Sequence, residues 1–308
     1  MIRTRILLTI CMFAFSFVYT QQEPVFSQYY VNKVILNPAI SGSQQHNTLL
    51  INSRTQWLGF NGSPVSTNIA YHGALNNRSA IGAHLMYDKV GPSMRSDLVL
   101  SYAYHIPLDY DKINLSFGIG TKLMYYNLNF NNINLPPAPD NAFSNKTYTK
   151  TIPEASSGVY LYGRNFYFGY SNVNLLESTF KDPLNDNFPN LVYRTHYAVG
   201  GYRFDVINND WELEPSFLVR KKRINSSVTD FTIRLIYLKN TWGGLNYRND
   251  GNIGINFGFG SGNINFCYSY DHTFKGDISE YNYGTHELSI EFSFETLGGK
   301  RHISFWEY

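Results

Sequence analysis

The sequence predicts an all-β fold, an up-and-down transmembrane β-barrel of about 14 antiparallel strands with an N-terminal non-barrel segment. Three observations predict it. Large apolar residues alternate with small or polar ones along most of the chain. Only 16% of the residues are charged and 17% are aromatic, whereas ordinary soluble domains are about 25% charged. Finally, long and short connections alternate between the predicted strands.

The alternation has a period of two residues, which is the period of a β-strand. In residues 113–120, Ile, Leu, Phe and Ile alternate with Asn, Ser, Gly and Gly. Residues 252–259, 264–271 and 287–295 repeat the pattern. The two faces of each strand must therefore meet different surroundings. In a membrane barrel the apolar face meets lipid and the polar face lines the lumen.

An even number of strands is typical of single-chain bacterial barrels. Most of the predicted strands reach the length of about 9–11 residues that a tilted strand needs to cross the hydrocarbon core. The predicted strands are residues 47–60, 65–75, 79–90, 93–107, 111–129, 154–163, 165–172, 193–206, 210–222, 226–239, 240–248, 251–260, 262–271 and 284–296.

The connections support this count of strands. Brief polar turns follow the even-numbered strands, whereas the long connections near residues 130–153, 173–192 and 272–283 all follow odd-numbered strands. The long connections must therefore lie at one end of the barrel, as the external loops of outer-membrane barrels do. A soluble β-sandwich or β-helix is the alternative. Two packed sheets, however, cannot hide a large apolar face on almost every strand.

The beginning of the chain predicts export. Arg3 and Arg5 precede an apolar stretch at residues 6–18, and polar residues follow Thr20. This is the pattern of a cleaved secretory signal peptide. No later segment is long and apolar enough for a membrane-spanning helix. The expected parts of the chain are a signal peptide at 1–20, an N-terminal plug or docking segment at 21–46, the barrel at 47–296 and a short tail at 297–308.

The chain that remains after cleavage is formally neutral, because Lys+Arg falls from 25 to 23 and then equals the 23 Asp+Glu. A protein that binds nucleic acid would need a basic stripe, so nucleic acid is not expected as a partner. Cys267 is the only cysteine left in this part of the sequence, and no intrachain disulfide is expected.

No catalytic, metal or cofactor site is predicted. His72, His84, His105 and His196 fall on the predicted lumen face, but their spacing does not indicate the three or four converging ligands of a metal site. Hydrogen bonding inside the lumen is the preferred interpretation of these histidines. The sequence contains no G-x-S-x-G element, and serines are expected all along a polar lumen, so catalysis is not expected.

Three other features have ordinary structural interpretations beside functional ones. Residues 182–187 are rich in oxygen ligands but lack the Gly and final Glu of a calcium loop, so a solvated turn is preferred. Residues 220–223, Arg-Lys-Lys-Arg, fit anionic lipid, an acidic partner, or simply a strand that leaves the membrane. Trp57, Trp211 and Trp242 lie towards strand ends, where aromatic girdles are expected.

Residues 24–67 do not follow the barrel pattern. They contain Phe-Ser-Gln-Tyr from Phe26, then Asn37-Pro38-Ala39, then Arg-x-Gln-Trp-x-Gly-Phe-x-Gly-x-Pro from Arg54 to Pro64. This succession resembles the PorP/SprF family of type IX secretion system membrane proteins from the Bacteroidetes. Residues 285–290 also look like the family's last strand, so the resemblance covers nearly all of the exported chain. Residues 40–42, Ile-Ser-Gly, and the short tail depart from the family's usual pattern.

The resemblance implies a non-enzymatic component of the secretion and gliding machinery in the outer membrane, which helps to export or anchor a specific secreted protein at the cell surface. The implied partners are type IX secretion components, the C-terminal domain of a secreted adhesin-like protein, and outer-membrane lipid. No cofactor is implied. A porin-like solute channel without a dedicated protein partner is the alternative.

Within the unusual N-terminal region, we expect certain residues to bind the partner or the plug. Asn37-Pro38 favours an extended or turn conformation there. Arg54 and Gln56 are expected to face the lumen and hold the N-terminal segment, whereas Trp57 is expected to face lipid. The full set of expected residues is Phe26, Ser27, Gln28, Tyr29, Asn37, Pro38, Arg54, Gln56, Gly59, Phe60 and Pro64.

Overall fold

The structure, a computed structural model, describes residues 25–108, 112–129, 147–180, 190–207, 210–222, 227–276 and 283–295. The predicted signal peptide, the possible calcium loop at 182–187, Arg223 and the tail at 297–308 lie outside these residues. Among the described residues, no helix has the length and apolar character needed to span a membrane.

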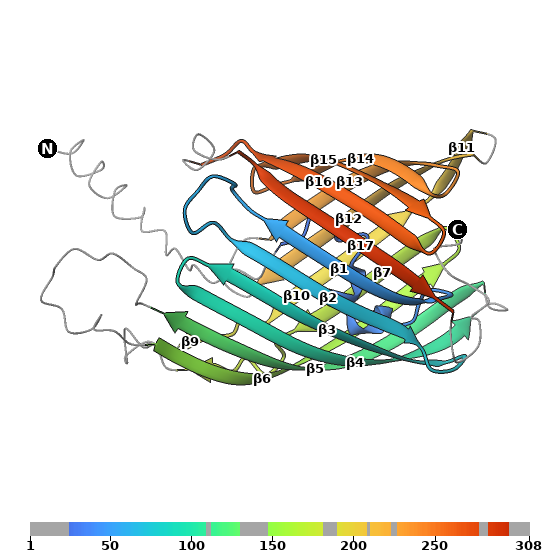
Figure 1. The fold of residues 1–308 in the computed structure, drawn as a ribbon. Coiled ribbons are helices and arrows are strands. Elements are labelled where there is room, and N and C mark those ends of the chain that lie inside the picture. Colours follow the sequence, from blue (N-terminus) through green and yellow to red (C-terminus); the bar gives the residue numbers. More distant parts are fainter. Residues whose placement is uncertain are drawn as a thin grey trace, which may run out of the picture.

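The strands of the wall form one 15-stranded antiparallel sheet that closes on itself, because β1 pairs with β17 and β10 pairs with both β7 and β12. β10 and β11 are two pieces of one crossing, interrupted at Arg203, and both pair with β12. The described chain therefore crosses the wall 14 times, with neighbouring crossings adjacent in the sequence. The predicted up-and-down barrel is confirmed (Figure 1).

The wall strands are β1 (Asn47–Thr55), β2 (Val65–Ala74), β3 (Ser79–Val90), β4 (Ser93–Leu108), β5 (Ile113–Asn129), β6 (Thr147–Gly163), β7 (Phe166–Val173), β10 (Thr195–Tyr202), β11 (Phe204–Ile207), β12 (Trp211–Lys222), β13 (Val228–Tyr237), β14 (Thr241–Arg248), β15 (Asn252–Ser261), β16 (Ile264–Thr273) and β17 (Thr285–Phe294). A separate short ladder of β8 (Thr179–Phe180) and β9 (Asn190–Leu191) lies in the connection between β7 and β10.

Two strand boundaries differ clearly from the predicted ones. β1 ends at Thr55 rather than at residue 60, because Trp57 and Gly59 adopt positive φ angles of 51° and 92° and turn the chain. β6 begins at Thr147 rather than at residue 154, because its pairing with β5 continues to the last residue of that strand. Strand β6 therefore begins seven residues earlier than predicted.

The strand ends that are joined by the long connections, between β5 and β6, β7 and β10, and β16 and β17, lie at the same end of the barrel as the strand ends joined between β1 and β2. Longer loops are external in bacterial barrels. We call this end the outer end and the opposite one, with the brief turns, the inner end. The alternation of loop lengths that the sequence predicts is thus present in the wall.

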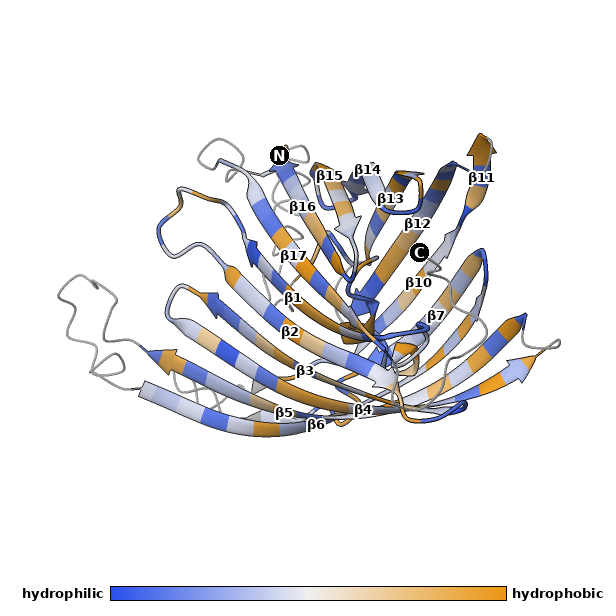
Figure 2. Ribbon diagram, turned by 45° about the vertical axis from the view of Figure 1, so that its right-hand side comes forward, coloured by the Kyte–Doolittle hydropathy of each residue, from blue (hydrophilic) through white to orange (hydrophobic). Residues whose placement is uncertain are grey.

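Apolar and polar residues alternate along the strands (Figure 2). On β15, Ile255 and Phe257 are more than half exposed on the outside, whereas Asn256 is buried in the lumen. Two positions contradict the sequence-based prediction. Trp242 is not in a girdle but is buried in the lumen. His196 faces outwards, because the buried Tyr197 sets the alternation of β10 and fills the lumen instead.

The outward face can be tested by placing a charge on it. Ile255→Arg should destabilise the barrel by about 2–4 kcal/mol, the cost of a cation near the middle of the lipid-facing wall. Urea unfolding in lipid vesicles measures the difference. Leu176→Arg is the control, because Leu176 is equally exposed but lies in the outer connection after β7. Equal destabilisation by both substitutions would contradict a lipid-facing position for Ile255.

Candidate functional site

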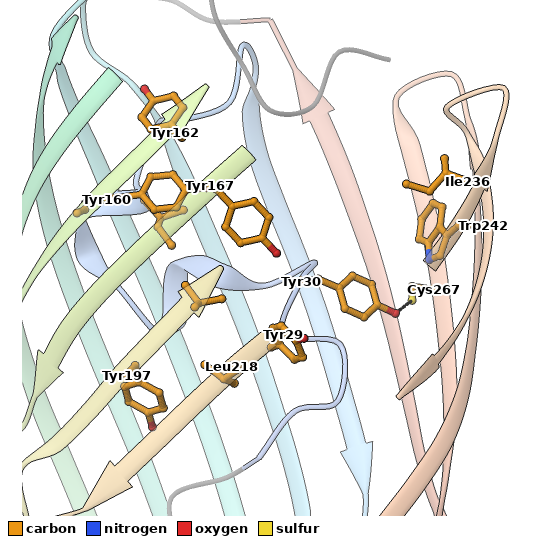
Figure 3. Packing of buried hydrophobic residues seen from close by; sticks show 13 residues of the cluster. Tyr29, Tyr30, Tyr160, Tyr162, Tyr167, Tyr197, Leu218, Ile236, Trp242 and Cys267 are labelled. Carbon is orange, nitrogen blue, oxygen red and sulfur yellow. Dashed lines mark hydrogen bonds between the residues drawn. The ribbon is translucent and has the colours of Figure 1, made fainter. Parts of the chain in front are cut away.

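Residues 25–46, which we call the lumen segment, lie inside the barrel (Figures 1 and 3). The segment forms two short 3-10 turns, η1 (Lys33–Ile35) and η2 (Pro38–Ile40). Asn37 is extended and caps η2, because its side-chain oxygen accepts the N–H of Ala39 at 2.9 Å. Pro38 takes the first position of the turn, where a missing N–H leaves no bond unmade.

The lumen segment runs from the outer end of the barrel to the inner end. Ser27 contacts Arg54, the penultimate residue of β1 at the outer end. Gly42 donates its N–H to Nδ1 of His72 at 3.2 Å, near the inner end of β2. The chain then enters β1 at Asn47 and returns to the outer end. The segment thus crosses the lumen before the wall begins.

A buried cluster of charges fixes the outer part of the lumen segment. Arg54 Nη1 donates to Ser27 Oγ at 2.9 Å, to Asp271 Oδ2 at 2.8 Å and to Glu287 Oε2 at 2.9 Å. Ser27 donates its own N–H to Glu287 Oε2 at 2.8 Å and its hydroxyl to Asp271. Arg248 Nη2 donates to Ser27 Oγ at 3.3 Å. Because these groups are removed from water, loss of one charge would leave the others uncompensated.

Gln28 extends this anchor along β17. Its backbone N–H donates to Glu287 Oε1 at 3.2 Å. Its side-chain amide donates to Ser269 Oγ at 3.1 Å and to the Glu287 carbonyl at 3.0 Å, and its side-chain oxygen accepts from Ser289. Both the donors and the acceptor of this amide are therefore used by the wall.

Two tyrosines pack the middle of the segment against the wall (Figure 3). The Tyr29 hydroxyl lies 3.0 Å from Ser216 Oγ, and the Tyr30 hydroxyl lies 3.6 Å from Cys267 Sγ. The guanidinium of Arg234 lies over the Tyr30 ring at 4.1 Å from its centroid, in the geometry of a cation–π contact. Neither tyrosine is more than 1% exposed, so the lumen is filled at this level.

Lys33 places a buried ammonium group in the same region. Its Nζ lies 4.1 Å from the centroid of the Tyr167 ring. Glu214 attracts the charge of this group, whereas Arg234 and Arg203 repel it.

Glycines in the wall let η2 approach the strands closely. A Cβ atom on Gly118 would lie 2.2 Å from the backbone nitrogen of Ala39, and one on Gly158 would lie 2.0 Å from Asn37 Oδ1. No side chain fits in either gap. Asn37 also donates its amide N–H to the backbone carbonyl of Val159 at 3.0 Å. The segment and the β5–β6 part of the wall are thus complementary in shape as well as in hydrogen bonding.

The structure brings most of the expected site residues together. Phe26, Ser27, Gln28, Tyr29, Asn37 and Pro38 are all buried in the lumen, and Arg54 contacts Ser27 from β1. The sequence-based interpretation did not include Tyr30, Lys33, or the wall residues Asp271, Glu287 and Gly158. Asp271 and Glu287 could have been found, since both lie on the polar faces of the last strands and barrel closure sets Glu287 opposite Arg54.

The other four expected residues lie elsewhere, in the turn at the outer end that follows β1. Gln56 donates its backbone N–H to the Pro64 carbonyl at 2.9 Å and lies beyond the strand, so the alternation that points Arg54 inwards does not continue to it. Gly59 lies under Tyr283, whose ring would be 2.5 Å from a Cβ atom at Gly59.

Phe60 is about half exposed in the same turn. Trp57, which we expected to face lipid from a strand, also lies in this turn. The structure therefore divides the expected residues into a lumen group and an outer-turn group. In the described ranges, no three His, Cys, Asp or Glu side chains are arranged to hold a metal ion.

Comparison with known families agrees with this architecture. A family model described as type IX secretion system membrane protein PorP/SprF matches residues 18–292. The chain belongs to the PorP/SprF family. A search of curated proteins finds no match to this PorP/SprF protein. Its family and its barrel fold together assign it to the outer membrane.

Solved structures of bacterial barrels are similar to this PorP/SprF protein. The P. putida toluene transporter TodX is 8% identical, with a TM-score of 0.51 over 85% of this chain and 93% of that chain. The Acinetobacter baumannii outer membrane protein Omp33 is 9% identical, with a TM-score of 0.46 over 82% of this chain and 100% of that chain. At such identities the likeness concerns the fold alone.

Removing the central cation should release the outer part of the lumen segment. Arg54→Ala leaves Asp271 and Glu287 without their shared cation, and a broken buried ion pair costs about 3–5 kcal/mol. We expect faster hydrogen exchange and protease cleavage at residues 25–32, with the barrel still folded. Arg78→Ala, at the exposed inner turn after β2, is the control. Unchanged protection of the segment would refute this role for Arg54.

A methyl group added to the wall beside η2 should displace this turn without any change in charge. Gly158→Ala would place a methyl group against Asn37, so we expect weaker protection from hydrogen exchange at residues 36–41. Gly243→Ala is the matched control, because a Cβ atom there meets nothing within 4 Å. The close fit of η2 to the wall would be wrong if both variants exchanged at the wild-type rate.

Proposed function

We propose that this PorP/SprF protein is a non-enzymatic component of the type IX secretion machinery that helps to export or anchor a specific secreted protein at the cell surface. The observation that carries the proposal is a lumen filled by the chain's own residues. Within the described residues, two cavities that lie between the lumen segment and the wall have volumes of about 60 Å³ and 20 Å³. Such spaces hold a few water molecules, not a solute path.

The outer turn offers a surface for a protein partner. Leu58, Phe60 and Tyr283 are 43%, 49% and 76% exposed there. Leu58 donates its N–H to the Gly284 carbonyl at 2.8 Å, and Tyr283 donates its N–H to the Leu58 carbonyl at 2.8 Å. These bonds fix the backbone that carries Leu58 and Tyr283 beyond the strands. Exposed apolar side chains that are gathered and held in place are typical of interaction sites.

We propose type IX secretion components and the C-terminal domain of a secreted adhesin-like protein as the partners of this surface. We also propose, as the resemblance implies, that the protein takes part in gliding and comes from the Bacteroidetes. The lumen segment begins at this end of the barrel, so a partner at the outer turn would lie beside its first residues. The exposed apolar side chains and the family to which the chain belongs support these partners.

The partner is tested by purifying the tagged full-length protein from its own outer membrane in mild detergent and identifying its companions by mass spectrometry. We expect secretion subunits or the C-terminal domain of a secreted protein. These companion proteins should no longer be recovered when Leu58, Phe60 and Tyr283 are replaced by Ser. Replacing Leu75 and Leu238 by Ser is the control, because both are about half exposed but lie in inner-end turns. Recovery of the protein alone would contradict the proposal.

The porin alternative is tested separately, by ion conductance in planar bilayers. The wild-type protein should conduct poorly because the lumen segment fills the barrel, and Arg54→Ala should conduct more because its segment is loosened. A steady, high conductance of the wild-type protein would instead support a solute channel.

A further inference from the structure

The outside of the barrel carries a groove of about 510 Å³ at the outer end, between β7, β10 and β12. Four basic residues line it, Arg194, His196, Lys221 and Lys222, against one acidic residue, Glu177. Basic side chains are therefore concentrated where these strands leave the membrane on the outer side. The lumen segment and the outer turn that carry the proposed function do not include any of these residues.

Contacts with neighbouring residues position two of the four basic side chains at this rim, His196 and Arg194. His196 and Lys221 lie opposite each other on β10 and β12, both on the outward face. The Tyr170 hydroxyl lies 2.8 Å from His196 Nδ1. Arg194 Nη2 donates to the Leu175 carbonyl at 2.7 Å, which fixes its guanidinium beside the groove. The same nitrogen lies 3.6 Å from Glu177 Oε2, so a ligand would meet two positioned basic groups, one of them ion-paired, beside the exposed Lys221.

Below the basic groups the groove becomes apolar. The small Ala198 on β10 lies between Tyr170 on β7 and Val219 on β12, its neighbours in register. The furrow ends one outward position further along β10, where the Phe217 ring closes over Gly200, 2.7 Å from where a Cβ atom would lie. The groove therefore joins a cationic rim to a short apolar furrow that faces the hydrocarbon.

A second groove on the outward face lacks this combination. It has a volume of about 380 Å³ and lies over β2 to β6, and its lining contains Ile69, Leu98 and Leu123 but no basic residue. Grooves between outward side chains are thus present elsewhere on the described wall. The basic rim distinguishes the groove at β7, β10 and β12.

We propose that the groove at β7, β10 and β12 binds a phosphorylated glycolipid of the outer leaflet. The phosphate would accept hydrogen bonds from Lys221 and Arg194, as arginine and lysine commonly bind phosphate groups. An acyl chain would lie in the furrow over Ala198. The location selects this lipid, because the outer leaflet of a bacterial outer membrane is built largely of phosphorylated glycolipid and the groove opens at the outer end.

The proposal is tested by native mass spectrometry of the full-length protein in detergent, titrated with bis-phosphorylated lipid A, with dephosphorylated lipid A and with phosphatidylglycerol. We expect stoichiometric binding of the bis-phosphorylated form. Lys221→Glu should weaken it about tenfold or more, the loss expected when a charge-assisted hydrogen bond is removed. Ala198→Phe should weaken it as well, because the larger side chain fills the furrow without changing the charge.

Lys89→Glu is the matched control. Lys89 is exposed at an outward position near the outer end of β3, so the change of charge is the same but lies away from the groove. Its binding of lipid A should equal that of the wild type. Equal weakening by Lys221→Glu and Lys89→Glu, or equal binding of dephosphorylated lipid A or of phosphatidylglycerol, would overturn the proposal. Heat-dependent gel mobility confirms that each variant is a folded barrel.

Discussion

The structure depends on the closure of the sheet, since a backbone N–H or C=O group left unpaired in hydrocarbon costs several kcal/mol. The first wall strand therefore pairs with the last, from Asn47 opposite Phe294 to Thr55 opposite His286. This pairing also sets Arg54 opposite Glu287. The buried charge cluster that holds Ser27 is thus assembled from the two ends of the wall, and it exists only in the closed barrel.

A closed wall with a polar inner face must still satisfy its buried charges. Asp271, Glu287 and Arg248 are all buried, and each of them hydrogen-bonds to Ser27 of the lumen segment. Removing two charges from water offsets much of their attraction, so such clusters contribute less to net stability than to the choice of one arrangement. We therefore interpret the cluster as the device that fixes where the lumen segment lies.

The sequence predicted the wall well because the period of two residues follows directly from two environments, lipid and lumen. The prediction failed at positions where the lumen is as apolar as the lipid. The lumen at Trp242 is filled with aromatic rings, so a buried tryptophan resembles one in a girdle. On β10 the larger side chain, Tyr197, points inwards and His196 outwards, which reverses the usual pattern. The contacts of Gln28 with β16 and β17 escaped prediction because they join residues that are far apart in the sequence.

The end of β1 connects the lumen group and the outer-turn group, which the sequence analysis predicts as one site. Arg54 holds Ser27 from inside the wall, and the outer turn begins after Thr55, the next residue. A partner bound to Phe60 would therefore act on the strand end that anchors the lumen segment. Coupling of this kind requires that binding favours one position of the strand end over another. The short covalent path from Arg54 to the turn makes β1 the element through which surface binding and segment docking would influence each other.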